Sequence, residues 1–102
     1  MSPTITVTLR MEVREELVEQ FVDGIPALVR ETLSAPGLIS ARALRNSDSP
    51  GTVLFVEEWD STTAFATYIA WRTERGDMLK LGQMLSKPPE IVTWSSVAHA
   101  LS

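Results

Sequence analysis

Hydrophobic and polar residues alternate strictly at the start of the chain, and this alternation ends near residue 13. The apolar positions are Ile5, Val7, Leu9, Met11 and Val13, and threonine, arginine or glutamate separates them. A period of two that contains β-branched residues is typical of a β-strand with two different faces. The pattern therefore predicts a first strand over residues 5–13.

From Arg14 onward the apolar residues recur every three or four positions, which is the spacing of an amphipathic helix. One face carries Leu17, Phe21, Ile25, Leu28, Val29 and Thr32, and the opposite face is polar and rich in glutamate. Pro26 removes a backbone donor, so we expect a kink near Gly24. Ala35-Pro36-Gly37 is expected to end the helix.

The middle of the chain predicts two strands that are joined by a turn. Residues 38–46 alternate weakly, whereas residues 52–59 contain a run that is apolar on both faces. The turn-forming residues 47–51 separate these segments, which predicts an antiparallel hairpin.

The last part of the chain predicts two helices and a fourth strand. Asp60–Thr63 supplies N-cap residues for a helix that carries Phe65, Tyr68, Ile69 and Arg72 on one stripe. Gly76-Asp77 is expected to break this helix before a second short one over residues 78–85, and Pro88-Pro89 precedes a strand over 91–97. The order β-α-β-β-α-β predicts a ferredoxin-like α+β fold, with a four-stranded antiparallel sheet and the helices on one face.

The composition restricts both the organisation and the chemistry of the chain. A length of 102 residues favours a single domain over residues 1–102, with a core at about 4–97. The chain has no cysteine and its one histidine is His99, a tail residue, so we expect no catalytic thiol, serine–histidine triad or metal site. The net charge of −4 without a basic cluster argues against nucleic-acid binding. Neither a basic leader nor a membrane-spanning apolar run is present, so we expect a cytoplasmic protein.

Helices on one face would leave the other face of the sheet uncovered, although the strand over 52–59 is apolar on both. Leu54 and Val56 lie on one side of it, and Val53 and Phe55 on the other. Because burial of each such side chain contributes about 1.5–3 kcal/mol, an exposed second face would be costly. We therefore expect a homodimer in which two sheets pack face to face. The alternative is a monomer with scattered exposed apolar residues.

Five segments, taken in order, resemble a known family. They are the strand over 5–13, Ala35-Pro36-Gly37-Leu38, Ser49-Pro50-Gly51-Thr52, Phe55–Ser61 and Pro88-Pro89. Over about residues 4–97 the chain resembles the antibiotic biosynthesis monooxygenase domain of the dimeric α+β barrel superfamily. The resemblance implies a cofactor-independent oxygenase for quinols or aromatic polyketides, or a haem-degrading enzyme. The haem-degrading branch has an asparagine on the first strand and a histidine ligand in the second helix region. This chain has Thr6 and Thr8 on that strand and no histidine over 61–85.

The resemblance also implies a pocket between the sheet and the helices of each subunit. Helical spacing brings Ala64, Tyr68, Trp71 and Arg75 to one face there. Tyr68 and Trp71 are candidates to hold an aromatic substrate, and Arg72 or Arg75 to stabilise a phenolate. The alternative is core packing for the aromatic residues and a solvated, salt-bridged helix end for the arginines.

Glu57 and Glu58 follow an apolar run and lie on opposite faces of the strand, so one of them points inward. A buried carboxylate with a raised pKa is a candidate base, and we assign this role to Glu58. The alternative is an ion pair with Arg42 or Arg45 on the neighbouring strand. The further candidates for substrate contacts are Trp59, Phe65, Arg75 and Trp94, with core or interface packing as the alternative for the two tryptophans.

Two functions are compatible with these observations. The first is a cofactor-independent monooxygenase that oxidises a quinol or polycyclic aromatic substrate, because cysteine, clustered histidine and a glycine-rich dinucleotide motif are all absent from the sequence. The second is a non-catalytic barrel that binds a small aromatic or hydrophobic ligand. An ionisable group enclosed beside the pocket would favour the oxygenase.

Overall fold

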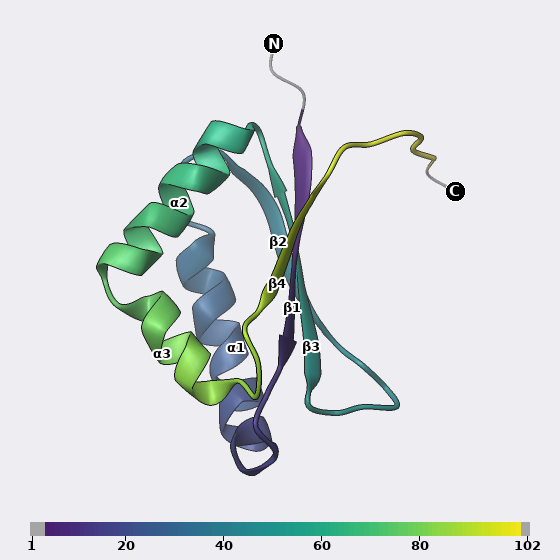
Figure 1. The fold of residues 1–102 in the computed structure, drawn as a ribbon. Coiled ribbons are helices and arrows are strands. Elements are labelled where there is room, and N and C mark those ends of the chain that lie inside the picture. Colours follow the sequence, from purple (N-terminus) through teal and green to yellow (C-terminus); the bar gives the residue numbers. More distant parts are fainter. Residues whose placement is uncertain (1–3, 101–102) are drawn as a thin grey trace.

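A computed structural model describes residues 4–100 and shows one antiparallel sheet with all helices on one side (Figure 1). The strands are β1 (Ile5–Glu12), β2 (Leu38–Arg45), β3 (Thr52–Trp59) and β4 (Glu90–Trp94), in the order β2-β3-β1-β4. This confirms the predicted ferredoxin-like arrangement. The prediction that the chain starts without a basic leader concerns residues 1–3 among others, and these three lie outside the described residues.

Three helices and one 3-10 turn cover the sheet. The turn η1 (Glu15–Leu17) leads into α1 (Val18–Thr32), so the α-helix begins later than the predicted Arg14. The helix α1 continues through Pro26 without interruption. Within residues 4–100, no helix combines the length and the apolar character that crossing a membrane requires.

The second helical region is divided as predicted. Helix α2 (Thr62–Glu74) is capped at its N-terminus by Ser61, whose Oγ accepts a hydrogen bond of 3.1 Å from the Ala64 backbone N–H. Gly76 has a φ of 82°, in the left-handed region that glycine adopts without a steric penalty, and it separates α2 from α3 (Asp77–Met84). The axes of α2 and α3 therefore differ in direction (Figure 1).

The hydrophobic core lies between the sheet and the helices. Its buried apolar side chains are Ile5, Val7, Leu9, Met11, Val13, Phe21, Val53, Phe55, Trp59, Tyr68 and Leu85. Every second residue of β1 and of β3 points into this layer, which explains the strict alternation of the first strand. The register pairs Leu9 with Phe55 and Val7 with Glu57, so Glu57 also belongs to the helix-facing side.

The fourth strand ends earlier than predicted. It stops at Trp94 rather than at Val97, and Trp94 pairs with Thr6 near the start of β1. Beyond this point β1 offers little further backbone to pair with, so residues 95–100 leave the sheet (Figure 1).

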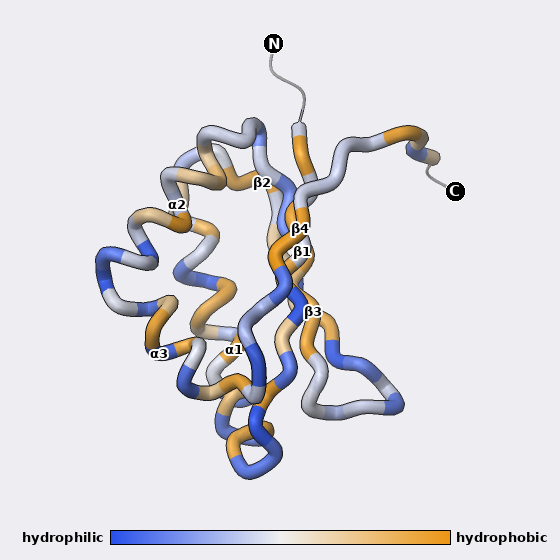
Figure 2. The backbone as a smooth tube through the Cα atoms, in the orientation of Figure 1, coloured by the Kyte–Doolittle hydropathy of each residue, from blue (hydrophilic) through white to orange (hydrophobic). Residues whose placement is uncertain are grey.

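The outer face of the sheet carries both polar and apolar side chains. Figure 2 shows hydrophobic residues recurring along β1, β3 and β4. On the outer face, Leu44, Val92 and Trp94 are exposed, and Leu54 and Val56 are half-buried by their neighbours. The described residues leave this face without a covering helix, as the sequence predicted.

Candidate active site

An open cavity of about 360 Å³ lies between the sheet and the three helices. Most of its walls are apolar and come from β1, β3, α1 and α3; examples are Leu9, Phe55, Phe21, Ile25, Met78 and Leu81. The polar lining is confined to a few side chains: Gln20, Glu31, Glu57, Tyr68, Arg72, Asp77 and Lys80. A largely apolar cavity with few polar groups is the usual form of a site for a small organic molecule.

Glu57 is the carboxyl group that enters this cavity from the sheet. Its side chain is almost fully buried, with a relative exposure of 2%. Its Oε1 accepts a hydrogen bond of 3.1 Å from Trp59 Nε1. Burial raises the pKa of Glu57, and the Trp59 hydrogen bond and the charge of Arg72 oppose this shift only in part.

Glu57 is one of the residues that line the cavity, and its second oxygen, Oε2, is not held by Trp59. This oxygen accepts no hydrogen bond from the residues that the structure describes. Among these residues, every fully enclosed side-chain nitrogen or oxygen has a hydrogen-bond partner. Glu57 Oε2 is therefore not fully enclosed, and it remains available to a ligand hydroxyl.

The outward glutamate is Glu58, the residue to which we assigned the base. It is exposed on the outer face of β3, opposite the cavity, while Glu57 occupies the inward position. The predicted alternative, an ion pair between the inward glutamate and a neighbouring arginine, is also not formed. Among the described residues Arg45 pairs instead with Glu19 at 2.9 Å, and Glu57 bonds to Trp59.

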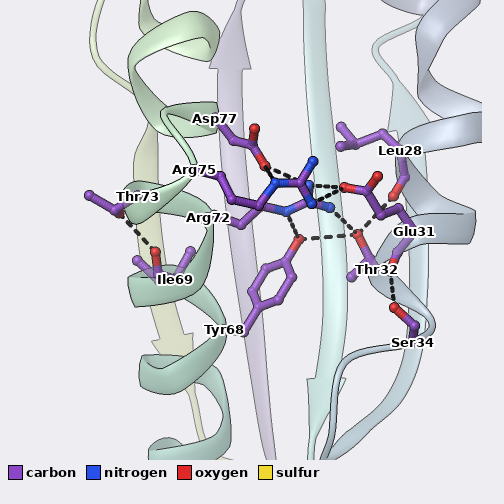
Figure 3. Close-up of polar contacts among 10 residues, drawn as sticks. All are labelled: Leu28, Glu31, Thr32, Ser34, Tyr68, Ile69, Arg72, Thr73, Arg75 and Asp77. Carbon is purple, nitrogen blue, oxygen red and sulfur yellow. Dashed lines mark hydrogen bonds and ion pairs between the residues drawn. The ribbon is translucent and has the colours of Figure 1, made fainter.

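Arg72 lies at the edge of the cavity and is held by four side chains (Figure 3). Its Nε donates to the Tyr68 hydroxyl at 2.8 Å, and its Nη1 donates to Asp77 Oδ2 at 2.9 Å and to Glu31 Oε1. Its Nη2 donates to Thr32 Oγ1 at 3.3 Å. Burial by itself would lower the pKa of Arg72, but these hydrogen bonds raise it overall, so the guanidinium stays charged.

The hydroxyl of Tyr68 is fully used by its neighbours. Thr32 Oγ1 donates its hydrogen to the Leu28 carbonyl at 2.9 Å, so it must accept from the Tyr68 hydroxyl, 3.1 Å away. Tyr68 therefore donates to Thr32 and accepts from Arg72 (Figure 3). This chain of hydrogen bonds connects α1, α2 and α3 beside the cavity.

The other predicted site residues lie around the cavity rather than in it. Trp59 is fully buried and packs against Phe65 and Tyr68, with ring centroids 5.7 and 5.0 Å apart. Within the described residues, neither Trp59 nor Phe65 lines the cavity. Trp59 acts behind the cavity, where it donates the hydrogen bond to Glu57.

Trp71, Arg75 and Trp94 do not line this cavity, although Trp71 lines a second, open pocket together with Ala64 and Tyr68. Trp71 is 40% exposed, and the Arg75 guanidinium lies 4.5 Å from its ring centroid. Arg75 also contacts the same two carboxylates that hold Arg72. Trp94 lies on the outer face of the sheet and donates to Thr8 Oγ1 at 2.9 Å. The structure thus brings Tyr68 and Arg72 together at the cavity and leaves Trp71, Arg75 and Trp94 apart from it.

Sequence reasoning missed three polar residues of the site. Glu31 and Asp77 were not proposed as site residues. Glu57 was considered as the base, but that role was assigned to Glu58. Within the described residues, no three histidine or acidic side chains are grouped so that they would hold a metal ion. The buried charged side chains that line the cavity are Glu57 and Arg72.

Comparisons with known structures show the same fold. A conserved protein from Methanosarcina mazei Go1 superposes with a TM-score of 0.81 and 23% identity, over 92% of this chain and 93% of that one. A Mycobacterium tuberculosis protein gives 0.82 and 16%, over 96% and 99%. SnoaB, a cofactor-independent oxygenase from Streptomyces nogalater, gives 0.81 and 15%, over 96% and 97%. No curated protein matches the chain by sequence.

A family model provides the decisive sequence match. The model described as antibiotic biosynthesis monooxygenase matches residues 4–73, from the start of the described chain to the last turn of α2. This match includes β1, α1, β2 and β3, and with them Glu57 and most of the residues that hold Arg72. Because it covers more than half of the sequence, the chain belongs to the antibiotic biosynthesis monooxygenase family.

Proposed function

We propose that this chain is a cofactor-independent monooxygenase that oxidises a quinol or polycyclic aromatic substrate with molecular oxygen. The substrate occupies the cavity between the sheet and the helices, and Glu57 is the base that takes a proton from its hydroxyl group. The observation that carries the proposal is the buried Glu57 carboxyl, which lines an apolar cavity, has a raised pKa and keeps one oxygen without a hydrogen bond to the described residues. Membership of the family supports the same reaction class.

In the proposed reaction the substrate itself supplies the electrons. Glu57 removes the proton of a phenolic hydroxyl, and the anion becomes electron-rich at a ring carbon. That carbon forms a bond to O2, and the proton on Glu57 returns to the outer oxygen to give a hydroperoxide. The O–O bond then breaks as the proton on the same carbon leaves. One oxygen atom stays in the product as a carbonyl, the other departs as water, and the phenol becomes a quinone.

The surrounding residues support this chemistry by position. The apolar walls shield the reactive anion from water on the sides that they cover, which limits its reprotonation by solvent. Trp59 holds Oε1 of Glu57 and leaves Oε2 for the substrate. Tyr68 and Arg72 form one side of the cavity, and their mutual hydrogen bond fixes the shape of that side.

Oxygen uptake with a panel of hydroquinones tests the proposal directly. We expect consumption of O2 with at least one bicyclic or tricyclic hydroquinone, at a rate that added iron or flavin does not change. An oxygen electrode measures the rate, and heat-denatured protein is the control for autoxidation. Binding of the hydroquinones without any uptake would contradict the oxygenase and favour the alternative function, a barrel that binds an aromatic ligand.

We also propose that two copies associate through the outer faces of their sheets. That face carries Leu44, Val92 and Trp94 as exposed apolar side chains, and Leu54 and Val56 at its centre. Packing of two such faces would remove these side chains from water, and a two-fold axis makes one patch complementary to itself.

A charge placed on the outer face is expected to separate the two copies. Sedimentation at low micromolar concentration should give twice the chain mass of 11.3 kDa for the unmodified protein and a monomer for Val56→Lys. The matched control is Leu79→Lys, because Leu79 is 71% exposed on α3, on the other side of the molecule. An unmodified protein that sediments as a monomer would contradict the dimer.

A further inference from the structure

Five acidic or basic residues line the cavity, and their positions determine which charge a ligand can carry. Glu57 and Arg72 are buried, with exposures of 2% and 4%. Glu31 and Asp77 flank Arg72, and Lys80 is exposed on α3 where water screens its charge. Among the residues that the structure describes, therefore, Arg72 carries the only positive charge in the buried part of the cavity, and it is already paired.

The guanidinium of Arg72 has little hydrogen-bonding capacity left. Two carboxylates accept hydrogen bonds from Nη1, the Tyr68 hydroxyl accepts one from Nε, and Thr32 Oγ1 accepts one from Nη2. Arginine binds a free carboxylate best through two parallel N–H groups. Four of the five N–H groups are used, so an incoming anion would find one donor only.

The neighbouring carboxylates would also repel an anionic ligand. Glu31 and Asp77 together balance the charges of Arg72 and Arg75, which they both contact. In the buried part of the cavity a ligand carboxylate would be taken out of water between apolar walls without an unpaired positive charge beside it, which is unfavourable. A neutral phenol avoids this penalty, because its hydroxyl can exchange a hydrogen bond with Glu57 Oε2.

We infer that the cavity accepts uncharged phenols and excludes aromatic carboxylates, and that Glu31 and Asp77 determine this preference by occupying the Arg72 guanidinium. The inference rests on the proposed function, since it names the charge class of the substrate for the same cavity. Glu31 and Asp77 are positioning residues in this account. They act by occupying the Arg72 guanidinium.

Binding of 2-naphthol and of 2-naphthoate, two probes of the same shape, tests the inference by titration calorimetry at pH 7. The unmodified protein should bind 2-naphthol at least tenfold more tightly than 2-naphthoate. Asp77→Asn removes one negative charge and weakens one of the two hydrogen bonds that Arg72 Nη1 donates. It should strengthen 2-naphthoate binding about tenfold and change 2-naphthol binding by less than twofold. Glu31→Gln should act in the same direction and serves as the second variant.

The matched control is Glu74→Gln, which makes the same charge change at an exposed residue of α2 that does not line the cavity. It should leave the ratio of the two affinities unchanged, whereas a general loosening of the fold would weaken both ligands alike. Equal binding of both probes by the unmodified protein would overturn the inference, as would an absence of 2-naphthol binding or an unchanged ratio in both cavity variants. If only the proposed oxygenase activity is wrong, the protein should still bind 2-naphthol more tightly than 2-naphthoate. It should then consume no oxygen with any hydroquinone.

Discussion

Replacement of Glu57 by glutamine is expected to lower kcat for oxygen uptake by about 10²–10⁴-fold, the usual contribution of a positioned general base. Glutamine has nearly the same shape, and its carbonyl oxygen can still accept the hydrogen bond from Trp59 Nε1. What it loses is the ability to take a proton from a substrate hydroxyl. KM should change little, because the apolar walls that hold the substrate are unaffected. An oxygen electrode with the best hydroquinone of the panel measures both constants.

Glu58→Gln is the matched control, since it makes the same chemical change at the next residue, on the opposite face of β3. Its kcat should stay within about twofold of the unmodified enzyme. The two variants decide between the inward and the outward carboxylate as the base. A large loss of activity in Glu58→Gln together with full activity in Glu57→Gln would contradict Glu57 as the base and support Glu58.

The pH dependence gives an independent readout of the same group. A base works in its deprotonated form, so the rate should fall as the pH drops through the pKa of Glu57, which burial raises above 4.5. Stability should change in the opposite direction. The folded state holds the Glu57 proton more tightly than the unfolded state, so the contribution of this residue to stability is greatest at low pH and is lost as pH rises. Glu57→Gln should therefore be at least as stable as the unmodified protein at neutral pH.

The part of the site that the sequence could predict is the part that depends on local spacing. Strand β1 is buried on alternate residues, so its pattern predicted its faces correctly. In β3 both faces are apolar, and the pattern alone could not show which side the helices cover. The choice between Glu57 and Glu58 depended on this. The register with β1 resolves it, because Glu57 pairs with Val7, a residue of the buried face.

The rest of the site depends on contacts between distant parts of the chain. Arg72 and Glu31 are 41 residues apart in sequence and meet only because α1 and α2 lie on the same face of the sheet, where their side chains bridge the space between the two helices. No local spacing predicts that contact. The family resemblance correctly located the cavity between sheet and helices, but it did not show that Arg72 is already paired.

Replacement of Arg72 by methionine is expected to lower the free energy of unfolding by about 3 kcal/mol, the lower end of the range for breaking a buried ion pair. The lower end applies because Glu31 and Asp77 keep contact with water when the guanidinium is lost. Tyr68 would lose its donor, and the connection between α1, α2 and α3 would be weakened. Urea denaturation, followed by circular dichroism, measures the change.

Arg75→Met is the matched control because Arg75 contacts the same two carboxylates from an exposed position. Exposed ion pairs contribute about 0–1 kcal/mol, so this variant should be nearly as stable as the unmodified protein. Equal losses in the two variants would contradict a special role for the buried arginine. The two should also differ in pH profile. The positive charge of Arg72 lowers the pKa of Glu57, so its removal should shift the acid limb of the rate profile to higher pH, whereas loss of Arg75 should leave the limb in place.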